Sequence, residues 1–378
     1  MIIILTLTGV LSAIYALLDL SLFRGLRRVG RAEKSKRTPT ISILICARNE
    51  EKRLPKCLES LLQQKYPGEW TVWIADDRSE DATSSIIQTF CTRYPEQFHS
   101  IRIDSLPLGL SPKKHAITQL AQKAGGEIFL LTDADCVVPP GWILGMVENF
   151  NPTVDWVSGY SYFPDGNLLL GMQALDFLSH RTVDAGGVGL GIPITACGQN
   201  LGYRKTLFEE LGGFAGVDHV TSGDDDLLMH KLASKRPQAI QYCVDPSTFV
   251  WSASVDTWKA AWEQRKRWAS KTVHYSMPAL LLLGSVFAYY CMIILGIPLG
   301  LAWLAYSSHP LPLALASGAL LWKTAWDTLV MAQGIHLFGE QRLWRYYPAT
   351  ALVHIPLIIS AVLVGVFGKF TWKDGTTR

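Results

Sequence analysis

Long stretches without charged residues constrain this chain more than any other feature. No Asp, Glu, Lys or Arg occurs in the 51 residues 272–322, in the 23 residues 346–368, or in residues 1–18. A helix that crosses a bilayer needs about 20 mostly apolar residues, so these stretches are suited to membrane spans. Residues 38–270, in contrast, carry ordinary mixed charge and are long enough for one sizeable domain. The sequence therefore excludes a purely soluble protein, a disordered one and one made only of membrane spans.

The N-terminal segment, residues 1–23, is apolar and is followed directly by a basic run. That run, residues 24–37, contains seven Lys or Arg and one Glu. A signal peptide carries its positive charges before the apolar stretch, whereas here they follow it. We expect an uncleaved anchor, with the basic juxtamembrane linker and the following domain on the cytoplasmic side. A nucleic-acid site is the alternative for the run, but its position favours the membrane, and we expect no nucleic-acid partner.

Three more spans are expected near the C-terminus, at residues 277–306, 311–335 and 348–368. The second contains Lys323 and Asp327, four residues apart. Charges inside a membrane usually face a bundle interior or a cavity. The pair is therefore either functional or structural. In the structural case, the two residues form an ion pair, or the helix spans the membrane only in part.

The expected number of spans conflicts with the charge of the C-terminal tail. One N-terminal and three C-terminal spans would put residues 369–378 outside the cell. This tail is basic, and positive charge favours the cytoplasmic side. Either one C-terminal segment is re-entrant or the tail is an exception, and the sequence leaves both open.

The middle of the chain alternates strand and helix patterns. Strands are expected at 40–46, 70–75, 99–104 and 127–132, and helices at 51–64, 82–94 and 113–124. This alternation predicts an α/β domain with a mostly parallel sheet and right-handed crossovers. Ligands of such sheets bind at the carboxyl ends of the strands. Acidic residues follow two of these strands: Asp76 and Asp77 the second, and Asp133 and Asp135 the fourth.

The acidic residues suggest metal and proton-transfer chemistry. Asp133 and Asp135 are separated by one residue, and alternate side chains of an extended chain point the same way. A few carboxylate oxygens suit Mg²⁺ or Mn²⁺ bridging a diphosphate, although such a pair taken alone is more often a chance turn or a cap. Asp224, Asp225 and Asp226 are consecutive, so one of them can have a raised pKa and act as a base. They also precede a helical pattern at 227–233, whose first turn favours acids.

A third motif lies on an amphipathic stretch just before the membrane. Gln264, Arg267 and Trp268 lie within residues 257–271. The basic residues there could contact lipid headgroups. Alternatively, an Arg would bind a diphosphate while the Trp packs on a sugar or on the acceptor.

Taken together, the motifs resemble those of membrane-anchored family 2 glycosyltransferases, in the group that contains QxxRW and includes ceramide-glucosyltransferase-like enzymes. The resemblance covers about residues 40–270 and six motifs in order. These are SILICARNE (42–50), IADDRSEDAT (74–83), PKKHAI (112–117), TDAD (132–135), GQNLGYRK (198–205) with GDD (223–225), and QRKRW (264–268). One departure is Pro112, where the family usually has Gly.

The resemblance implies a GT-A catalytic domain, Rossmann-like with a mostly parallel central sheet, and a role for each matching position. Asn49, Glu50 and Asp77 would line the nucleotide. Lys113 would approach the nucleotide, with Lys114 as the alternative because Pro112 blurs the register. Asp133 would bind nucleotide or sugar, and Asp135 would ligate Mn²⁺ or Mg²⁺. Asp225 would be the general base, with Asp224 or Asp226 as alternatives. Gln264, Arg267 and Trp268 would hold the diphosphate and the acceptor.

The implied activity is inverting transfer of a sugar from a nucleotide-sugar, a UDP-sugar in the commonest case, to a membrane lipid at the cytoplasmic face. We expect the protein in a bacterial inner (plasma) membrane, with membrane lipids and a lipid or glycan acceptor as partners. A processive polysaccharide synthase is the alternative, and a non-catalytic scaffold or transporter is a distant one. The expected segments are 1–23 (anchor), 24–37 (linker), 38–250 (GT-A domain), 251–275 (interfacial helix), 276–368 (spans) and 369–378 (tail).

Overall fold

The computed structural model describes residues 2–31, 33–275, 277–368, 370–372 and 375–377. The chain forms two compact units. One unit consists of Arg28–Pro164 and Val183–Ser254; because it contains most of the expected GT-A domain, we term it the catalytic unit. The other consists of Met1–Arg27, Asp165–Thr182 and Val255–Arg378; because it contains the expected spans, we term it the membrane unit. The charged residues of the tail, Lys369, Lys373, Asp374 and Arg378, lie outside the described residues.

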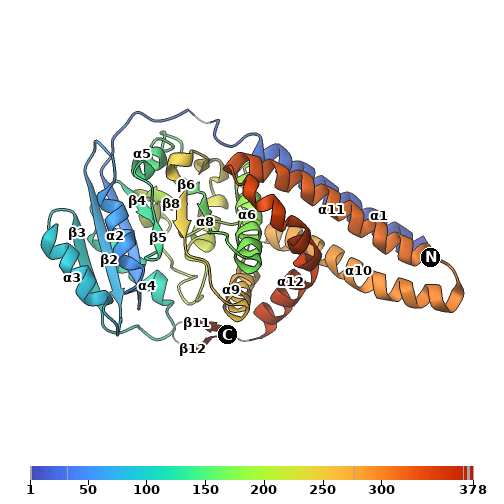
Figure 1. Cartoon of the computed structure of the whole chain (residues 1–378). Coiled ribbons are helices and arrows are strands. Elements are labelled where there is room, and N and C mark those ends of the chain that lie inside the picture. The colour runs from blue at the N-terminus through green and yellow to red at the C-terminus, as the bar shows by residue number, and fades with distance from the viewer. Residues whose placement is uncertain (1, 32, 276, 369, 373–374, 378) are drawn as a thin grey trace. The chain divides into compact units, whose positions relative to one another are not determined.

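The catalytic unit is built on a seven-stranded sheet in the order β3-β2-β1-β4-β8-β6-β9 (Figure 1). Its strands are β1 (Ile41–Ala47), β2 (Trp70–Asp77), β3 (Phe98–Ile103), β4 (Ile128–Leu131), β6 (Trp156–Gly159), β8 (Leu201–Arg204) and β9 (Ile240–Cys243). The first four strands in this order are parallel, and β8 runs antiparallel to both of its neighbours. The mostly parallel sheet expected from the sequence is therefore confirmed.

Helices and a small second sheet complete the catalytic unit. The helices are α2 (Leu54–Leu62), α3 (Thr83–Arg93), α4 (Pro112–Lys123), α5 (Trp142–Val147), α7 (Lys205–Glu210) and α8 (Asp226–Ala233). Short 3₁₀ turns lie at Pro237–Ala239 and Pro246–Thr248. The second sheet has the order β5-β10-β7, from β5 (Cys136–Val137), β7 (Ser161–Tyr162) and β10 (Val250–Ser252).

The apolar strands explain why this sheet forms the core. Ile43 and Leu44, which point to opposite faces of β1, are both buried, as expected for a strand of a parallel sheet covered on both faces. The chain passes from β1 to β2 and β3 on one side, and then returns to β4 on the other side of β1. The strand order therefore reverses between β1 and β4. In open α/β sheets the crevice at such a reversal is where ligands bind.

The membrane unit is helical. It contains α1 (Ile2–Leu26), α9 (Trp258–Ser270), α10 (Met277–Ser307), α11 (Leu311–Phe338), α12 (Tyr347–Phe367) and the first part of α6 (Leu168–Gly189). It also contains 3₁₀ turns at Lys271–His274 and Gln341–Tyr346, and a two-stranded pair of β11 (Phe370–Trp372) with β12 (Gly375–Thr377). Helix α11 packs against α10 and α1, and α12 packs against α9 (Figure 1).

Three described segments are long and apolar enough to cross a membrane: Ile4–Leu26, Ala279–Ser307 and Gln341–Phe367. They correspond to the expected first, second and last spans. Helix α11, the expected third span, is 28 residues long but is not among them, and it carries the two charged residues noted above. The two form an ion pair within it, because Lys323 Nζ lies 2.5 Å from Asp327 Oδ2. Tyr15 on α1 donates a hydrogen bond of 2.6 Å to Asp327, so the pair also joins two helices.

Two details differ from the expected segments. The interfacial helix is shorter than residues 251–275, because Val250–Ser252 belongs to β10 and the Thr257 side chain caps α9 by accepting from Ala260 N. Residues 165–182, expected within the GT-A domain, group with the membrane helices. The close approach of α6 and α11 explains this grouping: a Cβ at Gly334 would lie 2.2 Å from Thr182 Oγ1.

Candidate functional site

The acidic motif after β4 lies in a turn. Cys136 N donates to Asp133 O at 3.1 Å, which closes a turn over these four residues. Asp133 and Asp135 are therefore separated by a turn and not by the extended chain expected from the sequence. Asp133 and Asp135 are nevertheless both half-buried, while Ala134 between them is buried. Both carboxylates are thus accessible at the carboxyl end of β4.

Lys113, on the first turn of α4, links two of the acidic motifs. Its Nζ lies 2.8 Å from Asp133 Oδ1 and 3.0 Å from Asp224 Oδ2. Burial opposes the charged form of Lys113, but the two carboxylates outweigh it and hold the pKa of Lys113 well above its ordinary value. Burial raises the pKa of Asp224, and Lys113 counteracts that rise. One ammonium thus bridges segments 91 residues apart in the sequence, counted from 133 to 224.

The three consecutive acids have three different surroundings. Asp224 pairs with Lys113. Asp225 is the N-cap of α8 and accepts from the backbone N–H of Asp226 at 2.8 Å and of Gly198 at 2.9 Å. Asp226 is fully buried and accepts from the backbone N–H of Ala196 at 2.6 Å. The helix-capping interpretation is therefore confirmed for Asp225, and the functional role of the cluster stays a prediction.

Gly198 lies where these side chains meet. A Cβ on this residue would approach Lys113 Nζ to 3.1 Å, Asp224 Oδ2 to 3.3 Å and Asp225 Oδ2 to 3.6 Å. The first two separations are tighter than most real contacts of a Cβ atom. The absence of a side chain here lets the segment that begins at Gly198 lie against both acids.

The carboxyl ends of β1 and β2 supply the expected nucleotide residues. Asp77 is buried and accepts from Arg78 Nε at 2.8 Å and Nη2 at 3.0 Å, and Arg48 Nη1 lies 3.9 Å away. Asn49 and Arg78 both have positive φ, 53° and 54°. A non-glycine residue in this conformation is uncommon, and such residues concentrate at functional sites.

The loops after β1 and β2 are held together by their own polar groups. Asn49 N donates to Ser79 Oγ at 3.1 Å, and Asn49 Oδ1 accepts from Glu80 N at 2.9 Å. Glu50 N donates to Thr83 Oγ1 at 2.7 Å. The side chain of Asn49 therefore has a structural partner, in addition to any contact with a ligand.

Gln264, Arg267 and Trp268 lie on α9, in the membrane unit. All three are half-buried. Arg265, which lies inside the motif, is buried, and its guanidinium lies 5.3 Å from the centroid of the Trp268 ring. Burial lowers the pKa of Arg265 to about 9. The motif therefore contains a buried cation that contacts its tryptophan.

Two residues of α6 contact this cation. Asp176 forms an ion pair with Arg265, and His180 is hydrogen-bonded to it. Burial lowers the pKa of His180 to about 3, which keeps its ring neutral at physiological pH. We did not expect Arg265, Asp176 and His180 from the sequence. A signal was present, since Arg265 and Trp268 are three residues apart and Asp176 and His180 are four apart, the spacings that share a helix face.

The described side chains near Asp135 include few groups that could bind the expected Mn²⁺ or Mg²⁺. Among the described residues, no three His, Cys, Asp or Glu side chains form a group that could hold a metal ion. Mg²⁺ is commonly held by only one or two carboxylates together with substrate phosphates. The accessible carboxylates of Asp133 and Asp135 fit that kind of site, in which a diphosphate supplies further ligands.

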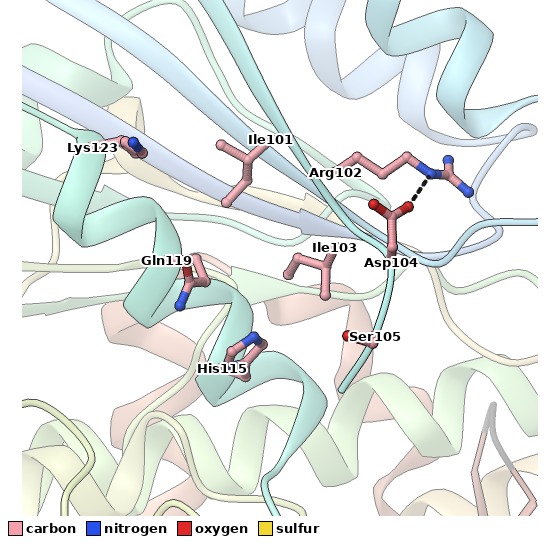
Figure 2. A pocket seen from close by; sticks show the side chains of 8 residues that line it. All are labelled: Ile101, Arg102, Ile103, Asp104, Ser105, His115, Gln119 and Lys123. Atoms are coloured by element: carbon pink, nitrogen blue, oxygen red, sulfur yellow. Dashed lines mark hydrogen bonds and ion pairs between the residues drawn. The ribbon is translucent and has the colours of Figure 1, made fainter. Parts of the chain in front are cut away.

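A pocket of about 420 Å³ lies between β3 and α4 (Figure 2), and no residue of the acidic motifs is among its lining residues. Ile101 and Ile103 from β3 line it, together with His115, Gln119 and Lys123 from α4. It contains none of the site residues expected from the sequence. Lys113 contacts Asp133 and Asp224 directly, and none of these three residues lines this pocket.

Known proteins share both the sequence pattern and the fold. The chain is 24% identical over 245 residues to "Probable glycosyltransferase YdaM" of Bacillus subtilis, covering 63% of this chain and 56% of that protein. It is 29% identical over 241 residues to "Beta-monoglucosyldiacylglycerol synthase" of Trichormus variabilis, covering 61% and 48%. The chain therefore spans about half the length of these curated relatives.

A solved structure and two family models agree with these similarities. The mannosyltransferase PcManGT of Pyrobaculum calidifontis, in complex with GDP-Man and Mn²⁺, aligns with a TM-score of 0.59 and 19% identity, covering 96% of this chain and 99% of that one. At this identity the likeness shows the fold. "Glycosyl transferase family 2" matches residues 42–212, and "Glycosyl transferase family group 2" matches residues 128–364. With the mostly parallel sheet and the acidic motifs at its strand ends, these matches show that the chain belongs to glycosyltransferase family 2 and has a GT-A catalytic fold.

Proposed function

We propose that the protein transfers one sugar from a nucleotide-sugar to the hydroxyl group of a membrane lipid. One observation carries the proposal: Lys113 bridges Asp133 and Asp224 beside the point where the strand order of the sheet reverses. This arrangement brings residues proposed for the donor next to the acidic cluster proposed to supply the general base. The apolar helices of the same chain supply the membrane context.

The donor would bind at the carboxyl ends of β1, β2 and β4. Asn49, Glu50 and Asp77 would contact the nucleotide, and Lys113 and Asp133 would contact its phosphates or the sugar. Asp135 would ligate Mn²⁺ or Mg²⁺, which when bound neutralises charge on the diphosphate. A UDP-sugar is the expected donor. The GDP-Man in the PcManGT structure makes a GDP-sugar the second donor to test.

In the proposed reaction the lipid hydroxyl attacks the anomeric carbon of the donor sugar. A new C–O bond forms as the bond from that carbon to the diphosphate breaks, so the configuration inverts. Asp225 accepts the hydroxyl proton, and the nucleoside diphosphate leaves with the electron pair. Asp225 suits this role because it is half-buried and oriented by two backbone N–H donors, whereas Asp226 is fully buried. Asp224 remains the alternative base.

Gln264, Arg267 and Trp268 are proposed to bind the diphosphate and the acceptor end. Arg265 would help by holding the Trp268 ring through the 5.3 Å cation–π contact. We further propose that the catalytic unit faces the cytoplasm of a bacterial inner membrane. The basic residues 24–37, directly after α1, support this orientation.

The test is a transfer assay with purified full-length protein. UDP-sugars and GDP-sugars are supplied in turn with Mn²⁺ or Mg²⁺ and mixed membrane lipids, and release of the nucleoside diphosphate is measured. We expect release that needs both lipid and metal, and that falls about 10²- to 10⁴-fold in Asp225→Asn, the range for loss of a general base. A ladder of long products would support a processive synthase instead. No release with any donor, or release that Asp225→Asn leaves unchanged, would exclude the proposed enzyme.

A further inference from the structure

The segment just before the acidic cluster needs external support to keep one conformation. Residues 211–222 contain neither helix nor strand. Gly212, Gly213 and Gly216 have positive φ, 65°, 53° and 84°. Glycines give a loop many alternative backbone states. The loop ends directly before Gly223, which leads into Asp224 and Asp225. Its conformation therefore sets where these acids lie.

Lys114 binds this loop from inside the protein. Only 1% of the residue is exposed. Its Nζ donates to three backbone carbonyls of the loop, at Val217 (2.7 Å), Val220 (2.8 Å) and Ser222 (3.0 Å). An ammonium has three donors, and a buried charge is costly unless it is hydrogen-bonded. The loop thus folds its carbonyls around the ammonium much as a cation site does.

A second residue of the same helix start adds to this attachment. Ser111 N donates to Asp218 O at 2.7 Å, and Ser111 Oγ donates to Thr221 O at 3.2 Å. Three residues near the start of α4 therefore have related tasks. Ser111 and Lys114 hold the loop backbone, and Lys113 pairs with the side chain of Asp224 directly after that loop.

We propose that Lys114 is a positioning residue, which holds the 211–222 loop so that Asp224 and Asp225 keep their register against Lys113 and Asp133. The inference rests on the proposed function, in which Asp225 takes the proton of the acceptor. Lys114 itself is remote from the reacting atoms, since its ammonium is occupied by loop carbonyls. Its loss therefore lowers turnover, whereas nucleotide binding at the ends of β1, β2 and β4 is preserved.

The main variant is Lys114→Met, which keeps the length of the side chain and removes the ammonium. Lys205→Met is the matched control, because Lys205 Nζ also donates to a backbone carbonyl, that of Ala124, at 2.9 Å, at the other end of α4. Both variants are made in the full chain. Each is measured by amide hydrogen exchange over residues 211–222, by donor affinity, and by kcat and KM.

We expect Lys114→Met to speed amide exchange in the loop by at least about tenfold, because local opening governs this rate. We expect kcat to fall about 100-fold with donor affinity within about twofold, as for an interaction that acts in the transition state. Lys205→Met should leave all of these values near those of the native protein. A variant Lys114→Ala is expected to regain part of kcat with added ethylammonium, because Lys114 lines a pocket of about 390 Å³ and the shorter side chain leaves room for a small cation beside the loop carbonyls.

Two results would overturn the inference. One is a Lys114→Met protein with native kcat, whether or not its loop exchanges faster. The other is joint loss of donor affinity and of exchange protection throughout the catalytic unit, which would make Lys114 a general stability residue. If the native protein transfers no sugar from any donor, the proposed function fails separately. The exchange comparison between Lys114→Met and Lys205→Met then still decides whether Lys114 holds the loop.

Discussion

Replacing Lys113 with Met tests the contact on which the candidate site depends. The side chain keeps its length and loses its charge. Asp133 and Asp224 then face each other without the ammonium between them, and Asp224 is only 12% exposed. Burial raises the pKa of Asp224 and Lys113 lowers it. Without Lys113, the pKa of Asp224 should rise further.

The size of the effect follows from the two contacts. Hydrogen bonds to charged groups contribute about 1.5–3 kcal/mol each. The Lys113 and Asp133 side chains are 23% and 31% exposed, so water screens the pair and the lower end applies. We therefore expect a loss of about 3 kcal/mol for the two contacts at 2.8 and 3.0 Å. For a unit of this size that corresponds to a fall in melting temperature of about 6–12 °C.

The pH dependence has a definite sign. A carboxyl group whose pKa is raised in the folded protein contributes stability that is fully present below its unfolded pKa, about 3.9. This contribution is lost as the pH rises through the folded value. Because Lys113→Met raises the folded pKa of Asp224, the variant should be closest to the native protein in acid. Its deficit should grow as the pH rises from about 4 through the raised pKa.

The assay is thermal unfolding of the native protein, Lys113→Met, Asp224→Asn and the double variant, at several pH values. The double variant should be more stable than the sum of the single changes predicts, by about 1–2 kcal/mol, because the two residues are in contact. Asp104→Asn is a surface control, since that side chain is 82% exposed. Additive losses, or a melting temperature of Lys113→Met within about one degree of the native value, would refute the pairing.

Three further changes have expected outcomes. Asp135→Ala should abolish the stimulation of activity by Mn²⁺ or Mg²⁺ while leaving the melting temperature of the catalytic unit unchanged; retained metal stimulation would refute the assignment. Gly198→Ala should lower kcat about tenfold. The new Cβ would lie 3.1 Å from Lys113 Nζ and 3.3 Å from Asp224 Oδ2, so it should displace the side chains whose positions turnover requires. A native kcat would show that the crowding is relieved elsewhere. Burial, and then the nearby carboxylates of Asp133 and Asp135, raise the pKa of the Cys57 and Cys136 thiols, so iodoacetamide should leave both unmodified at pH 8 in the folded protein, and rapid alkylation detected by mass spectrometry would contradict their burial.

Strands β1, β2 and β4 of the parallel half of the sheet were predictable from the sequence because they are mostly apolar. The expected strands 40–46, 70–75 and 127–132 correspond to β1, β2 and β4, with ends that differ by a residue or two. Such runs have no other stable location than the middle of a covered sheet. The later strands β6, β8 and β9 are as short as β4, four residues each, but each contains a polar residue or a glycine, whereas β4 is wholly apolar. Their sequence pattern therefore does not identify them.

The partners of the candidate site residues were not predictable in the same way. Spacing along the chain indicated that Asp133 and the acidic cluster lie at strand ends or helix starts. It could not indicate that Lys113 would pair with both, because that depends on how α4 packs in three dimensions. The different tasks of Lys113 and Lys114 were equally hidden, since adjacent helical residues point about 100° apart and the sequence does not tell which one faces the acids.

The most direct test of the central claim is the mass of the lipid product. Membranes that contain the native protein or Asp225→Asn are incubated with the active nucleotide-sugar, and the extracted lipids are analysed by mass spectrometry. We predict one lipid class whose mass increases by a single sugar residue with the native protein, and no such increase with Asp225→Asn. A ladder of several sugar residues, or the same single-sugar product from Asp225→Asn, would contradict the account.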